Sequence, residues 1–363
     1  MNIYIPLGLF LLLICYFHRN NPYKSVKAFI FSMSVMAIFG AIRYNMGADY
    51  LSYMQDFENV HGYGFDNFYD YIPSRTEPGF IFLLSIIPSF FAFVIVLTIA
   101  WHALISYVCV KFIPSQFLWL TFFLLLFDEH FIIQNYVALR SSIVCCLFML
   151  AFLCLLKRKK LWFIGLILLS TTLHTSAIAL LLFGFYEYSY RHIKKVNWQV
   201  LLPLFLVLLV FRQYITGILA SSVIENFSSM SRYEGYIENY NDRAFSVGSI
   251  LYMIISLVPP ILMIPTMKKE IDEKYLFIIF CSVVVLFMNI FVGSLMVRYF
   301  MYVGPLILVA YFRSSMYMVK GKQNLLFFSL VLCVSYNFFM IQFAPWFTSF
   351  LQYKTIFEAP SWV

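Results

Sequence analysis

Residues 43–80 read RYNMGADYLSYMQDFENVHGYGFDNFYDYIPSRTEPGF and form the longest polar stretch of the chain. This stretch contains six acids, two arginines (Arg43 and Arg75) and six tyrosines. Apolar runs border it on both sides, which predicts a loop that emerges from a membrane. The side on which the loop emerges determines how the other polar residues are interpreted.

The composition indicates a membrane protein. The 363 residues are 62% hydrophobic and 12% charged, whereas globular proteins carry about 25% charged residues. Apolar runs of roughly 18 residues recur along the chain, and each is long enough to cross about 30 Å of hydrocarbon. Because no water satisfies the backbone there, such runs must be helices. We therefore predict an all-α polytopic membrane protein in which residues 1–363 form a single integral-membrane domain.

Pro88 divides the apolar residues 79–111 into two pieces. We expect 79–87 to be a half-helix that dips into the outer leaflet, and 89–110 to be a full span. The other predicted spans are 3–17, 28–42, 116–134, 141–156, 161–173, 176–190, 198–216, 247–267, 275–294, 299–312 and 325–343. Together they give about twelve crossings.

Basic residues predict the orientation. The turns 18–27, 157–160, 191–195, 268–274 and 313–322 are short and basic, so they should be cytoplasmic. Both termini and the loops 43–78 and 217–246 then face the exterior. Lysine outnumbers arginine 13 to 4 on the predicted inner side, and arginine outnumbers lysine 7 to 1 on the outer side. Since arginine grips phosphate and carboxylate at two points, we expect an anionic ligand at the outer face.

Three arginines are candidates for binding that anion. Arg43, Arg140 and Arg298 all lie at predicted outer ends of spans, and a shared anion such as a lipid pyrophosphate would explain them. The alternative is that each side chain reaches the headgroups of the bilayer.

The histidines are interpreted separately. His174 suits an acid–base or phosphate-binding role, or it is satisfied by the neighbouring hydroxyls of Thr171, Thr172, Thr175 and Ser176. His102 is expected to be a hydrogen-bonded core residue. Asp128, Glu129 and His130 are expected to be solvated at the interface, because adjacent helical residues point about 100° apart and cannot converge on one metal ion. We predict no metal site.

The second outer loop contains SRYEGYIENYNDR, in which tyrosines alternate with charged residues. Arg232, Tyr233 and Tyr236 suit sugar rings, although an interfacial amphipathic helix would have the same pattern. The chain has no GxxxxGK[ST], GxGxxG or Asp-x-Asp motif, which argues against nucleotide-sugar or ATP-driven chemistry. We expect no cofactor, and no nucleic-acid partner because the basic residues lie in short clusters.

The pattern that several of these residues form resembles that of the EpsG-like family of Wzy-type polysaccharide polymerases. The resemblance comprises Arg43, Gly47, Asp49 and Tyr50, then Glu77-Pro78-Gly79-Phe80, Arg140 ahead of the basic turn 157–160, His174, and Arg298 with Tyr302. Their order holds over nearly the whole chain. One departure is Leu139-Arg140-Ser141, where the family commonly has Arg-Gln.

The resemblance implies a GT-C-like, metal-independent glycosyltransferase of the bacterial inner membrane. Its substrate would be an oligosaccharide repeat unit linked to undecaprenyl pyrophosphate, its site would face the periplasm, and a chain-length regulator would be a further partner. The product would be O-antigen, capsule or exopolysaccharide.

We assign expected roles on this basis. Arg140 and Arg298, followed by Arg43, would bind the pyrophosphate, and His174 would assist the phosphate or the acceptor. Asp49 or Glu77 would orient the acceptor hydroxyl or act as base, and Tyr50 would contact sugar. Two alternatives stay open: an O-antigen ligase that uses the same donor, and a flippase or exporter of lipid-linked oligosaccharides.

Overall fold

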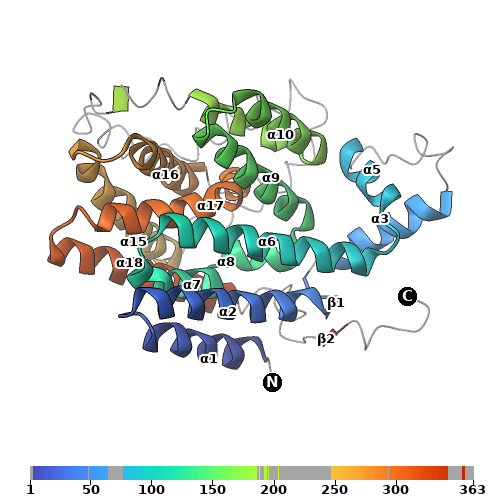
Figure 1. Ribbon diagram of the computed structural model, residues 1–363, viewed down its shortest axis with the longest axis horizontal. Coiled ribbons are helices and arrows are strands. Elements are labelled where there is room, and N and C mark those ends of the chain that lie inside the picture. Colours follow the sequence, from blue (N-terminus) through green and yellow to red (C-terminus); the bar gives the residue numbers. More distant parts are fainter. Residues whose placement is uncertain are drawn as a thin grey trace. The chain divides into compact units, whose positions relative to one another are not determined.

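The computed structural model describes residues 3–47, 49–63, 77–185, 188, 192–193, 195, 203, 247–292, 294–341 and 354–355. The chain forms two compact units, one made of Met1–Phe185 with Asn337–Val363 and the other of Tyr186–Tyr336. Helices dominate both units (Figure 1). The predicted loop 217–246, and the predicted span 198–216 apart from Pro203, lie outside the described residues.

Helices α2 (Pro22–Ala41), α6 (Phe90–Phe112), α9 (Leu139–Leu156) and α10 (Lys160–Leu173) form the body of the first unit. Each packs against the next in this order (Figure 1). Helix α1 (Tyr4–Phe17) packs on α2 and on α7 (Leu118–Phe127), which follows the short turn η1 (Ser115–Phe117). The 3-10 helix η3 (Thr175–Phe185) follows α10 and packs back against it.

The ends of these helices follow from local sequence. Asn21 accepts a hydrogen bond from the backbone N–H of Lys24, and Pro22 occupies the first turn of α2, which is a common helix start. Ser89 caps α6 in the same way by accepting from Ala92 N–H. The short helix α5 (Pro78–Ile86) ends just before Pro88, so the predicted division of residues 79–111 is confirmed.

The described part of the polar stretch 43–80 has more secondary structure than the loop expected from its composition. It contains α3 (Tyr50–Tyr63), because Tyr50, Tyr53, Met54 and Val60 follow a helical spacing and are buried on one face. The stretch begins with β1 (Arg43–Tyr44), which pairs antiparallel with β2 (Lys354–Thr355). A two-residue strand pair is thus the exception to the predicted all-α fold.

The predicted span at 116–134 is bent. Helices η1 and α7 meet α8 (Glu129–Ile132) and the π-helix η2 (Ile133–Val137) at an angle of 67°. The bend lies at Asp128, whose side chain caps α8 and lies 3.1 Å from His130 Nδ1. His130 is buried, so the expectation of a solvated interface residue was wrong.

The second unit contains α15 (Val247–Met263), η5 (Ile264–Lys268), α16 (Glu273–Val292), α17 (Ser294–Ser315) and most of α18 (Lys320–Ile341). Helices α16 and α17 pack along each other. Arg313 lies 4.2 Å from the ring centroid of Tyr275, and the Thr266 hydroxyl lies 3.4 Å from that of Ser314.

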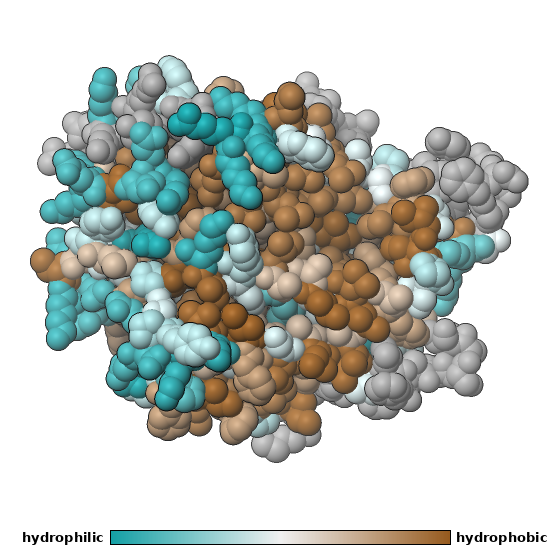
Figure 2. Space-filling view, viewed as in Figure 1, coloured by the Kyte–Doolittle hydropathy of each residue, from teal (hydrophilic) through white to brown (hydrophobic). Residues whose placement is uncertain are grey.

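Among the described residues, three helices are long and apolar enough to cross a membrane: α2, α6 and α9. The bent pair at 115–137 would be a fourth, and four shorter apolar helices were also found. Figure 2 shows apolar side chains over the centre of one face, where α6 and α9 lie in Figure 1. The structure therefore has the character of a helical membrane protein, while the count of about twelve crossings and the GT-C-like architecture stay predictions.

Candidate functional site

An ion pair joins two residues that the sequence analysis selected separately. Glu77 immediately precedes α5, and Arg140 is the second residue of α9. Arg140 Nη1 donates to Glu77 Oε2 at 2.6 Å, and the two side chains are 27% and 14% exposed. Arg140 Nε is buried and has no hydrogen-bond partner among the described residues. The guanidinium is therefore only partly occupied by the carboxylate.

His174 lies against the other oxygen of the same carboxylate. It ends α10 in an extended backbone conformation, which turns its buried side chain toward Glu77. His174 Nδ1 is 3.7 Å from Glu77 Oε1 and 3.0 Å from the Ser176 hydroxyl. The hydrogen bond to a neighbouring hydroxyl matches one reading of the sequence, and the contact with Glu77 adds to it. One carboxylate thus lies between a guanidinium and an imidazole.

Gly79 allows α5 to approach the end of α10 closely. A Cβ atom at this position would lie 2.7 Å from the carbonyl oxygen of Thr172, closer than a Cβ atom can approach without displacing the backbone. Thr172 is two residues before His174, and Gly79 is two residues after Glu77. This close approach therefore fixes the spacing between the carboxylate and the imidazole.

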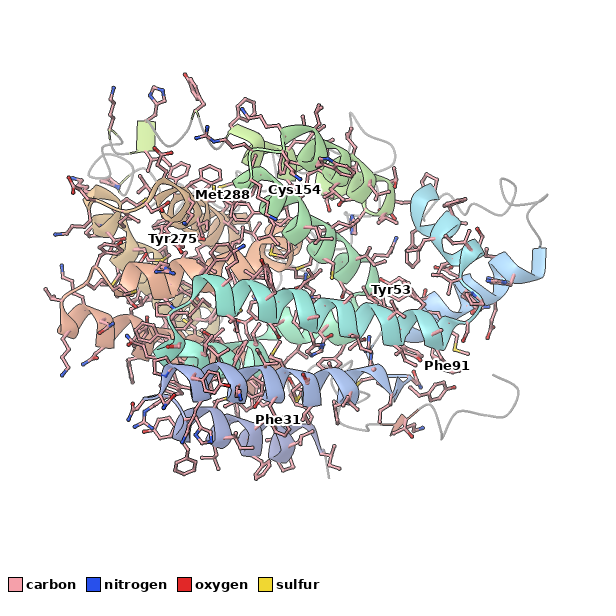
Figure 3. All side chains as sticks on the ribbon, viewed as in Figure 1. Phe31, Tyr53, Phe91, Cys154, Tyr275 and Met288 are labelled. Atoms are coloured by element: carbon pink, nitrogen blue, oxygen red, sulfur yellow. The ribbon has the colours of Figure 1, made fainter. Side chains whose placement is uncertain are left out.

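The aromatic rings beside Arg140 come from α3, which supplies Tyr53, and from α5, which supplies Phe80; the sequence analysis missed Tyr53. The rings of Tyr53 and Phe80 each lie 5.6 Å from Arg140 Cζ and 5.6 Å from each other. Figure 3 shows Tyr53 between α3 and the start of α9. A guanidinium over aromatic faces gains favourable cation–π energy. The signal available in the sequence was the spacing of Tyr50, Tyr53 and Met54, which places them on one face of a helix.

Asp56 lies one turn after Tyr53 on α3 and is half-buried. Burial raises the pKa of this carboxyl above its usual value, and the positive charge of Arg140 opposes that rise. Asp56 is therefore a second carboxylate within the electrostatic reach of Arg140. The sequence analysis did not select it among the six acids of the polar stretch.

Arg43 and Tyr50 lie in a different, fully packed environment. Arg43 is 0% exposed and donates to Gly40 O, to Thr98 Oγ1 at 2.7 Å and to Asn135 O at 3.1 Å. Tyr50 is buried against the rings of Tyr44 and Phe90. Burial also raises the pKa of the Tyr50 hydroxyl. In this conformation neither side chain presents a surface to a ligand.

Few or no contacts are described for most of the remaining predicted residues. Asp49 is exposed at the turn before α3, and no described contact brings its carboxylate to Glu77. Arg298 belongs to α17 of the second unit, and its side chain is outside the description. Arg232, Tyr233 and Tyr236 lie outside the described residues. His102 is buried and bonded through Nδ1 to Thr98 O at 2.8 Å, as predicted for a core residue.

The site is therefore built from Glu77, Arg140 and His174, with Tyr53 and Asp56 beside them. Within the part of the chain that is described, no three His, Cys, Asp or Glu side chains are grouped so as to hold a metal ion. What the site offers chemically is a partly open cation, a carboxylate and an imidazole in an apolar setting. Such a combination suits an anionic group next to a proton acceptor.

Comparison with known families gives one match that covers most of the chain. The model of the EpsG family matches residues 26–355, which is nearly the whole chain. The chain belongs to the EpsG family. EpsG proteins are Wzy-like polysaccharide polymerases, so glycosyl transfer in polysaccharide biosynthesis at the bacterial inner membrane is the general activity of this family. A search of curated proteins and a search of solved structures each gave no match.

Proposed function

We propose that this EpsG-family chain joins oligosaccharide repeat units that are linked to undecaprenyl pyrophosphate, at the outer face of the inner membrane. The observation that supports this function is the contact of Glu77 with both Arg140 and His174. The substrate is an amphipath whose pyrophosphate lies at the membrane surface. A cation at the start of an apolar helix, with aromatic rings around it, suits that depth.

The proposed step is a glycosyl transfer in which one bond to C1 forms and another bond to C1 breaks. The hydroxyl oxygen of the acceptor unit attacks C1 of the reducing sugar on a second carrier, and the C1–O bond to pyrophosphate breaks. The bonding electron pair stays on the pyrophosphate oxygen, and the acceptor proton passes to a base. Arg140, with Arg298, would stabilise the charge that grows on the leaving group, and one such donor is typically worth about 3 kcal/mol in the barrier.

Glu77 connects the two halves of this step. In the structure its carboxylate accepts a hydrogen bond from the Arg140 guanidinium. An incoming pyrophosphate would compete for the same donors, since arginine binds phosphate strongly. The carboxylate so released, whose Oε1 lies 3.7 Å from His174 Nδ1 in the structure, would be available to accept the acceptor proton. Binding of the lipid-linked sugar donor would thereby free Glu77 to act as the base.

The sugar would be held by the polar segments. Asp49 is exposed at the start of α3 and is proposed to contact the acceptor. Arg232, Tyr233 and Tyr236 of the second predicted loop would bind sugar rings by stacking and hydrogen bonding. Because Arg43 and Tyr50 are enclosed by protein, direct contact with substrate by either would require a different conformation. A chain-length regulator protein stays a proposed partner.

The test is incubation of the purified protein in detergent with lipid-linked repeat units. A ladder of products supports the polymerase, a single transfer to a lipid A core acceptor supports the ligase, and absence of any new glycosidic bond supports transport. Arg140→Ala should abolish the ladder at matched expression. Arg158→Ala is the control, because Arg158 is an exposed arginine in the turn after α9. Full-length polymer from Arg140→Ala would refute the assignment of Arg140.

A further inference from the structure

Arg43 hydrogen-bonds to the helix break ahead of Arg140. The π-helix η2 ends at Ala138, whose backbone (φ −95°, ψ 74°) is not helical, and α9 starts at the next residue. A helix that ends leaves its last carbonyl oxygens without partners in the helix. In a membrane each such group must find a partner within the protein. The break therefore persists only where other groups satisfy these carbonyls.

Separate donors satisfy three of the five backbone carbonyls of this π-helix, those of Ile133, Gln134 and Asn135. The Ile133 oxygen accepts from Ala138 N–H at 2.8 Å, and the Gln134 oxygen accepts from the Ser142 hydroxyl. The Asn135 oxygen accepts from Arg43 Nη2 at 3.1 Å. Arg43 is the one of these donors that comes from a distant part of the sequence. Its guanidinium thus acts as a cap for a helix end 92 residues away.

The same guanidinium ties the break to two further helices. Arg43 Nη1 donates to Gly40 O at the end of α2 and to Thr98 Oγ1 in the middle of α6. The Asn135 side chain in turn lies 3.4 Å from His102 Nε2, one turn further along α6. Three elements therefore meet at one planar cation. A single ammonium group does not reproduce the fork geometry that serves these acceptors.

We infer that Arg43 is a positioning residue that fixes the direction in which α9 starts and thereby the place of Arg140. Arg140 is the second residue after the break, so a small change in the backbone of 135–138 moves its guanidinium relative to Glu77. This inference rests on the proposed function for its effect on catalysis. It assigns Arg43 a role other than the direct pyrophosphate contact expected from the sequence.

The test combines hydrogen exchange with activity. In the purified protein without ligand, Arg43→Lys should raise amide exchange of residues 133–142 by about tenfold, while exchange in α1 stays unchanged. Thr98→Val removes one acceptor and no charge, so it should give a smaller increase in the same residues. Ser106→Ala, a buried hydroxyl two turns further along α6, is the control and should leave residues 133–142 unchanged.

Activity then separates the two roles of Arg43. A positioning role predicts that Arg43→Lys lowers kcat about tenfold in the wild-type background and less than about threefold in an Arg140→Lys background, because coupled residues are not additive. Unchanged exchange in both Arg43→Lys and Thr98→Val would overturn the inference, and so would full additivity. If the wild-type protein makes no polymer, the proposed function fails, while the exchange measurement still decides whether Arg43 holds the break.

Discussion

Replacing Glu77 with Gln tests the ion pair at the centre of the site. Two unit charges about 4 Å apart attract by about 4 kcal/mol at an effective dielectric constant near 20. Part of that attraction is offset by desolvation. Exposed pairs contribute about 0–1 kcal/mol, and removing one partner of a buried pair costs about 3–5 kcal/mol. With side chains 27% and 14% exposed, the Glu77–Arg140 pair lies between these limits.

We therefore expect Glu77→Gln to lower the free energy of unfolding by about 2 kcal/mol. The glutamine keeps a neutral acceptor oxygen, so the loss reports mainly on charge. For a domain of 150–250 residues this corresponds to a fall in Tm of about 4–8 °C. Tryptophan fluorescence during heating of the detergent-solubilised protein measures the change. Glu58→Gln is the control, because Glu58 is an exposed carboxylate on α3.

A double-mutant cycle with Arg140→Gln separates the pair from other effects of the substitution. If the contact exists in solution, the coupling energy between the two positions should be about 1–2 kcal/mol. A coupling energy of zero, together with an unchanged Tm for Glu77→Gln, would refute the ion pair. The proposal that pyrophosphate releases Glu77 from Arg140 would fall with it.

Two further substitutions test the surroundings of the ion pair. Gly79→Ala should lower Tm and activity, because the added Cβ atom would clash with Thr172. The control is Gly165→Ala, at a helical glycine whose Cβ atom would have nothing within 4 Å, and it should be neutral or stabilising by about 0.5–1 kcal/mol. Equal effects of the two substitutions would contradict the close approach. Asp56→Asn should raise Tm at pH 7, since burial raises the pKa of Asp56 and the folded state therefore favours its protonated form. This gain should shrink as the pH falls through the raised pKa and vanish below the unfolded value near 3.9. A fall in Tm at pH 7 would mean that attraction to Arg140 outweighs burial.

Local signals in the sequence predicted the elements whose ends are marked by particular residues. Pro88 and Ser89 separate α5 from α6, as expected from the proline. Arg140 and His174 were chosen as polar residues in or beside apolar segments, and Glu77 was chosen from the resemblance to the EpsG family. The structure brings these three together. Their pairing was not predicted, because Glu77 and Arg140 are 63 residues apart and no local pattern encodes the contact.

The features that the sequence analysis missed depend on packing between distant segments. The break at Ala138 contains neither proline nor glycine, and side chains from α9 and from β1 satisfy the carbonyls of Gln134 and Asn135. Arg43 was expected at a ligand because it lies at the predicted outer end of a span, at the same depth as Arg140 and Arg298. Arg43 is buried where it donates a hydrogen bond to the Asn135 carbonyl at that break, since such carbonyls need partners within the protein.

The pairing of β1 with β2 has a consequence for biogenesis. Arg43 and Tyr44 bond with Thr355 and Lys354, near the other end of the sequence. At a synthesis rate of about 5–20 residues per second, the partner strand is made about 15–60 s after β1. During that interval Arg43 can bond only with earlier parts of the chain, such as Gly40, Thr98 and Asn135, and lacks its strand partner. Formation of the β1–β2 pair is therefore a late step of maturation. A chain whose synthesis stalls before residue 354 would not form it.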